Sequence, residues 1–182
     1  MTDAPHIETE LGDRLQRIYG LGRRPKNPRE FFQLLRKVSE KSSGTQEFLR
    51  LVRGREAVIG QSDKPTKDWI AVKRKKIFTY CSYDTLMTAI LQGGGELGSA
   101  CPHCGDVMRV RIKGVEVESF SPNEMTFWWG TGPEGSPGNP MCDHLHLFPD
   151  KEHMAAWIRS HEGEMGFSFK MQDGVRLLKK RF

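Results

Sequence analysis

The chain has 182 residues, of which 37% are apolar and 28% charged, and its formal net charge at pH 7 is +5. This size and composition are typical of a globular protein with one moderate domain or two small ones that share a core. No apolar run approaches the ~20 residues of a membrane helix, and the first residues lack the basic and then apolar pattern of a signal peptide. We therefore expect a cytoplasmic protein without a membrane partner.

The N-terminal part is predicted to be helical. Apolar residues recur at helical spacing over residues 11–19, 28–39 and 46–53. This unit, residues 1–67, is compatible with a winged-helix-like fold with a reduced wing, or with a lid that packs on the rest of the chain. We favour the lid slightly, because no helix carries a cluster of Arg, Asn and Gln that reads base edges.

Basic residues gather at residues 23–24, 73–76 and 179–181. Such patches raise the odds of nucleic-acid contact. A solvated basic face explains them better, and at 73–76 no aromatic residues alternate with the basic ones to form a stacking platform. We expect no nucleic-acid partner.

Residues 68–182 are predicted to form a second domain of strands, turns and helices. Strands are predicted at residues 69–72, 107–112, 115–120, 125–129, 145–148 and 167–169, and helices at 84–91 and 150–160. The glycines at 93–95 stop the first of these helices. The predicted class is α+β, with the helical N-terminal unit packed on a mixed or antiparallel sheet flanked by helices.

Four cysteines carry the most informative chemistry: Cys81, Cys101, Cys104 and Cys142. Thiols are kept reduced in the cytoplasm, so four unevenly spaced cysteines favour metal binding or catalysis over a disulfide framework.

Cys81 lies three residues before Asp84 at the start of a predicted helix, so the Asp84 carboxyl group can approach the sulfur. A helix N-terminus also lowers the pKa of a thiol. The two residues are therefore a candidate nucleophile and proton carrier. Taken alone, however, they are better explained as a buried structural cysteine and a helix-capping acid.

The segment around Cys142 adds two histidines. If residues 142–146 form a strand, Cys142, His144 and His146 share one face, and Asp143 points away. We favour a ligand or catalytic role for Cys142. Each histidine taken singly is better explained as a polar, hydrogen-bonded residue at the edge of the strand.

Cys101 and Cys104 have the spacing of a knuckle, a turn whose two thiolates chelate a metal ion at ~2.3 Å. A structural zinc site needs two more ligands, which only Cys81, Cys142 or the histidines could supply. An open metal site, a two-thiol soft-metal site and a turn without metal all stay open.

Residues 80–86, 99–101 and 142–148, in this order and spacing, resemble the catalytic domain of the alkylmercury lyases, also called organomercurial lyases. The motifs Cys-x-x-Asp-Thr-Leu and Cys-x-His-x-His-x-Phe are fairly specific when they occur together. The resemblance covers about residues 69–166; the N-terminal helices match that family only in position and class.

The resemblance implies a function and a site. Cys81 and Cys142 would be the mercury-binding thiols, Asp84 would manage the proton, and Cys101 would be the family's further, structural cysteine. Cys104 departs from the pattern, so zinc at Cys101 and Cys104 is an added hypothesis. The implied reaction is protonolysis of a carbon-mercury bond to a hydrocarbon and Hg(II), without a consumed cofactor. The implied partners are an organomercurial substrate, small thiols and a mercuric reductase.

Two other functions stay open. One is a non-enzymatic metal-binding or metal-sensing protein, in which Cys101, Cys104 and Cys142 hold zinc, copper or mercury. The other is an enzyme of the same fold that cleaves another carbon-heteroatom bond.

Overall fold

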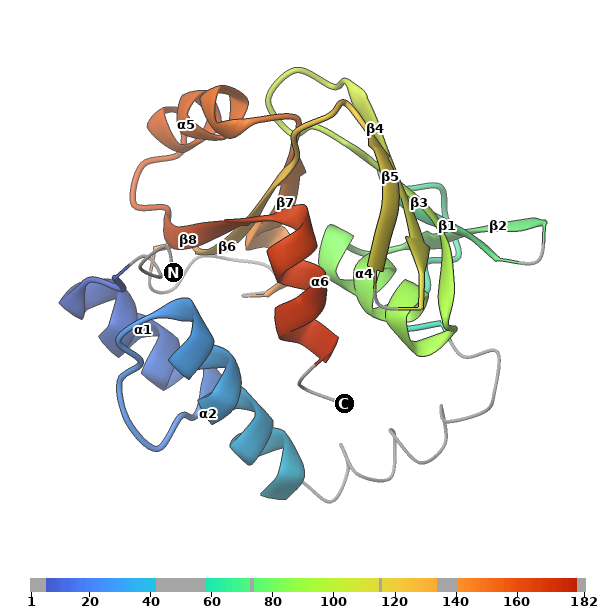
Figure 1. Cartoon of the computed structure of the whole chain (residues 1–182). Helices are drawn as coiled ribbons and strands as arrows, with labels where there is room; N and C mark the ends of the chain where they lie inside the picture. The colour runs from blue at the N-terminus through green and yellow to red at the C-terminus, as the bar shows by residue number, and fades with distance from the viewer. Residues whose placement is uncertain (1–5, 42–57, 73, 115, 134–140, 180–182) are drawn as a thin grey trace.

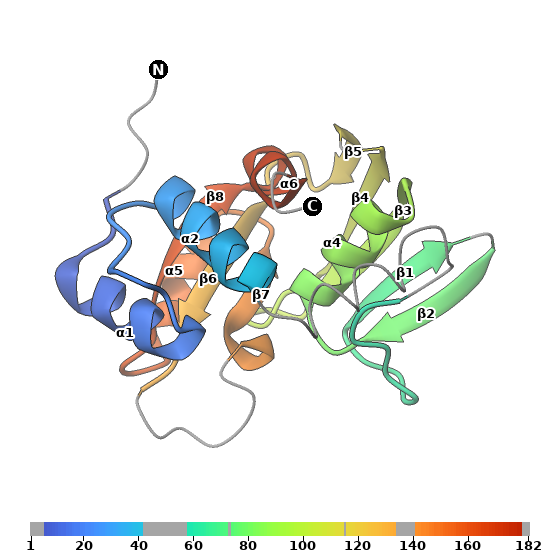
Figure 2. The same cartoon turned by 90° about the horizontal axis from the view of Figure 1, so that it is seen from below.

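A computed structural model describes residues 6–41, 58–72, 74–114, 116–133 and 141–179. These residues form two antiparallel sheets with helices beside and between them, which confirms the predicted α+β class (Figures 1 and 2). The helix predicted at 46–53 lies outside the described residues, as do residues 134–140. None of the described helices has the length and apolar character required to span a membrane.

The first sheet has five strands in the order β2-β1-β3-β4-β5. Its strands are β1 (Asp68–Val72), β2 (Lys75–Thr79), β3 (Gly94–Ala100), β4 (Val107–Lys113) and β5 (Glu116–Ser121). The alternation that predicted β4 is present, since Met108, Val110 and Ile112 are buried between exposed neighbours. This sheet forms the right-hand side of the molecule in Figure 1.

Strand β3 is not predicted from the sequence, because its glycines have low strand propensity. One of them is required by a close approach: Gly98 is paired with Trp69 across the sheet, and a Cβ atom on Gly98 would lie only 2.2 Å from Trp69 Cε2. The indole ring therefore covers the position that a side chain would occupy. Strand β2 is not predicted either, because its exposed lysines mask the strand pattern.

Helix α4 (Ser82–Leu91) packs on the first sheet and carries most of the candidate site. Eight of its residues are buried, so nearly all sides of the helix are covered by the rest of the protein. It begins after Cys81, which has an extended backbone, and ends before Gly93 in the left-handed conformation (φ +75°). The predicted glycine stop is thus confirmed.

The second sheet has three strands in the order β7-β6-β8. Its elements are β6 (Thr126–Thr131), β7 (Leu145–Phe148) and β8 (Met165–Lys170), followed by α6 (Met171–Lys179), while α5 (Lys151–Arg159) comes between β7 and β8. Helix α6 is an addition to the elements predicted from the sequence. In both views this helix lies between the two sheets (Figures 1 and 2).

Helices α1 (Thr9–Tyr19) and α2 (Pro28–Lys41) pack beside the second sheet through Trp129 of β6. The Trp129 ring is fully buried against the rings of Phe31 and Phe32, and its Nε1 donates a hydrogen bond to the Tyr19 hydroxyl at 3.0 Å. On its other side it contacts Tyr83 of α4. The N-terminal helices therefore share the core of the rest of the chain. The division of the chain into domains at residues 67 and 68 stays a prediction.

Candidate functional site

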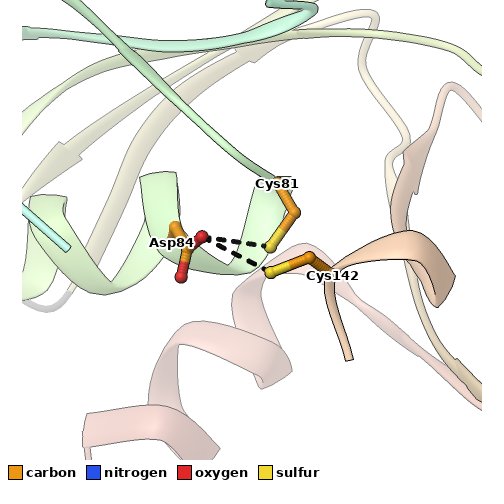
Figure 3. A group of neighbouring side chains, drawn as sticks. All are labelled: Cys81, Asp84 and Cys142. Atoms are coloured by element: carbon orange, nitrogen blue, oxygen red, sulfur yellow. Dashed lines mark hydrogen bonds between the residues drawn. The ribbon is translucent and has the colours of Figure 1, made fainter. Parts of the chain in front are cut away.

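The structure brings Cys81, Asp84 and Cys142 together between the two sheets (Figure 3). The sulfur of Cys81 lies 3.5 Å from Asp84 Oδ2, and the sulfur of Cys142 lies 3.6 Å from the same oxygen. Both thiols are therefore placed to donate a hydrogen bond to one carboxylate oxygen. Cys81 and Asp84 are buried and Cys142 is half-buried.

The local fold positions Cys81 and Asp84 because they belong to the first turn of α4. The carbonyl oxygen of Cys81 accepts hydrogen bonds from Thr85, through its backbone N–H at 3.1 Å and its hydroxyl at 3.0 Å. Thr79 at the end of β2 donates a further bond to this carbonyl at 3.4 Å. These contacts fix the start of the helix, and the spacing of three residues then turns the carboxyl group toward the sulfur.

Cys142 lies in the connection between β6 and β7 of the second sheet. It opens a short 3₁₀ helix, η1 (Cys142–His144), that leads into β7. The strand predicted at 145–148 is confirmed as β7, but the condition that it extends back to residue 142 is not met, because residues 142–144 are helical. Pairing with β6 begins only at Leu145, opposite Trp129, so the preceding residues have no strand partner there.

As a result, the two histidines do not share a face with Cys142. His144 Nδ1 lies 2.7 Å from Glu164 Oε2, and the other oxygen of Glu164 accepts a bond from Trp128 Nε1 at 3.0 Å. This chain of contacts anchors η1, and with it Cys142, to β6. His146 is buried against the Trp157 ring, with Lys67 Nζ 3.1 Å from its Nδ1. Burial and the Lys67 charge lower the pKa of His146 to about 2, so its imidazole is neutral.

The electrostatics of the site differ from the prediction for Cys81. Contact with the Cys142 thiol, burial and the Asp84 charge together raise the pKa of Cys81 far above its ordinary range. They outweigh the lowering that a helix N-terminus provides. Burial also raises the pKa of Asp84, although hydrogen bonds from Cys81 and Cys142 oppose this. The resting Cys81 therefore holds its proton, and Asp84 Oδ2 lies within hydrogen-bond distance of both sulfurs.

Gly60 covers the carboxyl group of Asp84, a contact that nothing in the sequence indicates. A Cβ atom on Gly60 would lie 2.1 Å from Asp84 Oδ2, and the residue has φ +57°. Its carbonyl oxygen accepts a hydrogen bond from the Tyr80 backbone N–H at 2.8 Å, which holds it beside the start of α4. Only glycine fits both the conformation and the contact.

A second buried carboxyl group, Asp68, lies behind the site. Ser82 Oγ donates to Asp68 Oδ1 at 2.7 Å and lies 3.1 Å from Ser99 Oγ. Burial raises the pKa of Asp68, and the nearby charge of Asp84 acts in the same direction. Hydrogen bonds from Ser99 and Ser82 and the charge of Lys67 act to lower it. Asp68 of β1 thus connects through Ser82 of α4 to Ser99 of β3.

Asp68→Asn is expected to make the stability of the fold less sensitive to a rise in pH above about 3.9. A raised folded-state pKa means that the folded protein binds the proton more tightly than the unfolded chain, so this stability is present at low pH and is lost as pH rises through the folded pKa. Between the unfolded value of about 3.9 and the folded pKa, the free energy of unfolding of the wild type should fall by about 1.4 kcal/mol per pH unit relative to Asp68→Asn.

Denaturant unfolding at several pH values measures this difference. Asparagine keeps an acceptor for Ser82, and Asp63→Asn at an exposed position controls for the charge change. A difference that is constant with pH would contradict the prediction.

Cys101 and Cys104 lie away from this site, in the turn between β3 and β4. Among the described residues, the ligand-type side chains form two groups. The first contains Cys81, Asp84 and Cys142; the second contains Cys104, Asp106 and His153. The hypothesis that Cys142 or Cys81 completes a site at the knuckle is therefore not supported by this arrangement.

Comparison with known proteins identifies the family. The sequence model of the alkylmercury lyase family matches residues 61–182, more than half of the chain. The protein therefore belongs to the alkylmercury lyase family. An alkylmercury lyase of Streptomyces lividans is 26% identical over 111 residues, which are 60% of this chain and 52% of that protein. The aligned part thus spans about half the length of that relative.

The fold is shared with a solved structure. The mercury-bound form of MerB2 matches with a TM-score of 0.55 and 20% sequence identity, over 82% of this chain and 80% of that one. At this identity the match shows the common fold alone.

Proposed function

We propose that the protein is an organomercurial lyase that cleaves carbon-mercury bonds by protonolysis. The observation that carries the proposal is the convergence of two thiols, one at the start of α4 and one in η1, on one buried carboxylate oxygen. A soft, thiophilic organomercurial cation matches two sulfur ligands, and a proton carrier beside them supplies what the leaving carbon needs. Membership of the alkylmercury lyase family supports this assignment.

In the proposed mechanism the half-buried Cys142 binds the organomercurial first and the buried Cys81 second. Each new sulfur-mercury bond displaces a thiol proton, because the thiolate is the ligand. One proton leaves to solvent and the other passes to the Asp84 carboxylate, which both thiols already contact. The raised pKa of Asp84 favours its holding this proton.

The carbon-mercury bond then breaks as Asp84 gives its proton to the carbon atom. Two thiolates increase the electron density on mercury and weaken its bond to carbon. The carbon takes the bonding electron pair together with the proton, and Hg(II) stays on the two sulfurs. For one organomercurial cation and two thiols, the products are one hydrocarbon, one Hg(II) dithiolate and one released proton. No cofactor is consumed.

Hg(II) must leave before the next turnover. Because mercury exchanges between thiolates, we propose that small thiols of the cytoplasm remove it, or a mercuric reductase that binds it through cysteines of its own. The half-buried Cys142 is the sulfur that an incoming thiol reaches first.

The test is release of benzene from phenylmercury in the presence of excess small thiol, measured by gas chromatography together with protein-bound mercury. We expect catalytic benzene formation and equal amounts of Hg(II). Tight mercury binding without benzene would contradict the proposal and support a metal-binding or metal-sensing role. Inertness toward phenylmercury and alkylmercury compounds alike would support another carbon-heteroatom substrate.

Gly60→Ala is expected to lower kcat for benzene release by about 10²-fold, because the new methyl group displaces the Asp84 carboxyl group and misplaces the proton. The left-handed backbone also costs about 1–2 kcal/mol of stability.

Gly20→Ala is the matched control. Gly20 also has a left-handed backbone, with φ +60°, but a methyl group added there would meet no atom of the described residues within 4 Å. This variant should lose similar stability and keep its rate. Equal rates for the two variants would show that Gly60 does not position Asp84.

A further inference from the structure

The turn between β3 and β4 has the backbone of a metal knuckle. The Gly105 N–H donates to the Cys101 carbonyl oxygen at 2.9 Å, and the Cys101 N–H donates to the Asp106 carbonyl oxygen at 2.9 Å. Gly105 has φ +83°, which closes the turn. Cys101 is buried at the end of β3, whereas Cys104 is exposed.

The side chains at this turn gather donor atoms of three kinds. The ligand atoms of Cys104, Asp106 and His153 all lie within 4.8 Å of one another. The Asp106 backbone N–H acts to lower the pKa of Cys104, but desolvation and the neighbouring Cys101 thiol leave that pKa raised. The Cys101 thiol is thus close to Cys104, and it lies outside the group of three ligand atoms.

His153 is already oriented for ligation. Its backbone N–H donates to Asp150 Oδ1 at 2.8 Å at the start of α5, and its Nδ1 lies 2.8 and 2.9 Å from the two Asp150 oxygens. With Nδ1 bonded to a carboxylate, Nε2 is the nitrogen for a metal ion. A carboxylate that fixes the tautomer of a ligating histidine is a usual outer partner in metal sites.

We propose that Cys104, Asp106 and His153, with Cys101 as the fourth donor, bind one zinc-like divalent ion. Sulfur, imidazole and carboxylate are the donors found in tetrahedral zinc sites. Mixed donors suit a borderline ion better than Hg(II), whose preferred soft ligands are the two thiols at Cys81 and Cys142. This site is separate from the mercury pair and does not depend on the proposed lyase activity.

The ion would connect the same two parts of the fold that supply the two reacting thiols. Cys104 belongs to the hairpin of the first sheet, and His153 to the helix that follows β7 of the second sheet. In the same way, Cys81 follows β2 of the first sheet and Cys142 precedes β7 of the second sheet. A bound ion would therefore hold the two sheets at a fixed distance and support the spacing of the sulfurs.

The test is zinc binding by reduced protein from which metal has been removed, measured by competition with a chromophoric chelator. The variants are Cys104→Ser and His153→Asn, with His161→Asn as a control at an exposed histidine outside the ligand group. A Cys81→Ser, Cys142→Ser double variant excludes the mercury pair. Circular dichroism checks the folding of each variant, and Co(II) spectra report thiolate ligation directly.

We expect one zinc ion per chain in the wild type, the double variant and His161→Asn, and a Co(II) thiolate charge-transfer band in each. Cys104→Ser and His153→Asn should weaken zinc binding by more than the roughly 10–100-fold caused by loss of an outer partner. Zinc binding that is lost in the double variant but kept in Cys104→Ser would overturn the proposal. Absence of the Co(II) thiolate band in the folded double variant would also overturn it.

Discussion

Asp84→Asn is expected to lower the rate of hydrocarbon release by about 10²–10⁴-fold while mercury still binds to the protein. Asparagine has nearly the same shape as aspartate and can accept the hydrogen bonds of both thiols, but it cannot take up and deliver a proton. Burial already disfavours the charged carboxylate, so the neutral side chain should not destabilise the fold. Single-turnover benzene release and mercury content measured on the same sample separate the two effects.

Asp143→Asn is the matched control, because Asp143 is an exposed acid beside Cys142. It should keep the wild-type rate. A wild-type rate in Asp84→Asn would place the proton donor elsewhere. Loss of mercury binding in that variant would mean that the carboxyl group holds the thiols in place and does not act as the donor.

Replacement of either reacting thiol by serine is expected to reduce turnover by about 10²-fold or more, since a hydroxyl group is a poor ligand for mercury and leaves only one sulfur to activate the bond. The two variants should differ in how fast they bind phenylmercury. Cys81→Ser keeps the half-buried Cys142 and should bind quickly, whereas Cys142→Ser keeps only the buried Cys81 and should bind slowly. Mass spectrometry of the protein adduct over time measures this order.

Cys101→Ser and Cys104→Ser are the controls for this pair of variants. Neither residue lies in the group formed by Cys81, Asp84 and Cys142, so both variants should keep the order of binding, with Cys142 before Cys81. Equal binding rates in Cys81→Ser and Cys142→Ser would contradict the proposed order.

The sequence predicts the contact between residues of the site that are close together in the chain. The contact of Cys81 with Asp84 follows from a spacing of three residues at a helix start, which fixes geometry without knowledge of the fold. Cys142 is 58 residues from Asp84, and its approach depends on how two sheets pack. Spacing could not place it; only the combined motifs suggested that the segments belong together.

Failures of prediction have equally specific causes. The alternation of Cys142, His144 and His146 presumed a strand, but β6 pairs with β7 only up to Leu145. The pKa of Cys81 was expected to fall because the helix dipole is visible in sequence, whereas burial and the second thiol are not.

Gly60 and Asp68 carry no local signal, because each acquires its role from a contact across the fold. The second ligand group shows the same limit. Cys101 and Cys104 are visible as a knuckle, but His153 joins them only through the packing of α5.

Trp129 has a consequence for how the chain can be shortened. The family match begins at residue 61, yet the Trp129 ring within it is covered by Phe31 and Phe32 from outside that span. A fragment of residues 61–182 would expose the part of this ring that Tyr19, Phe31 and Phe32 cover. We expect such a fragment to aggregate, so the two N-terminal helices are a requirement for solubility as well as for the support of Tyr83 and α4.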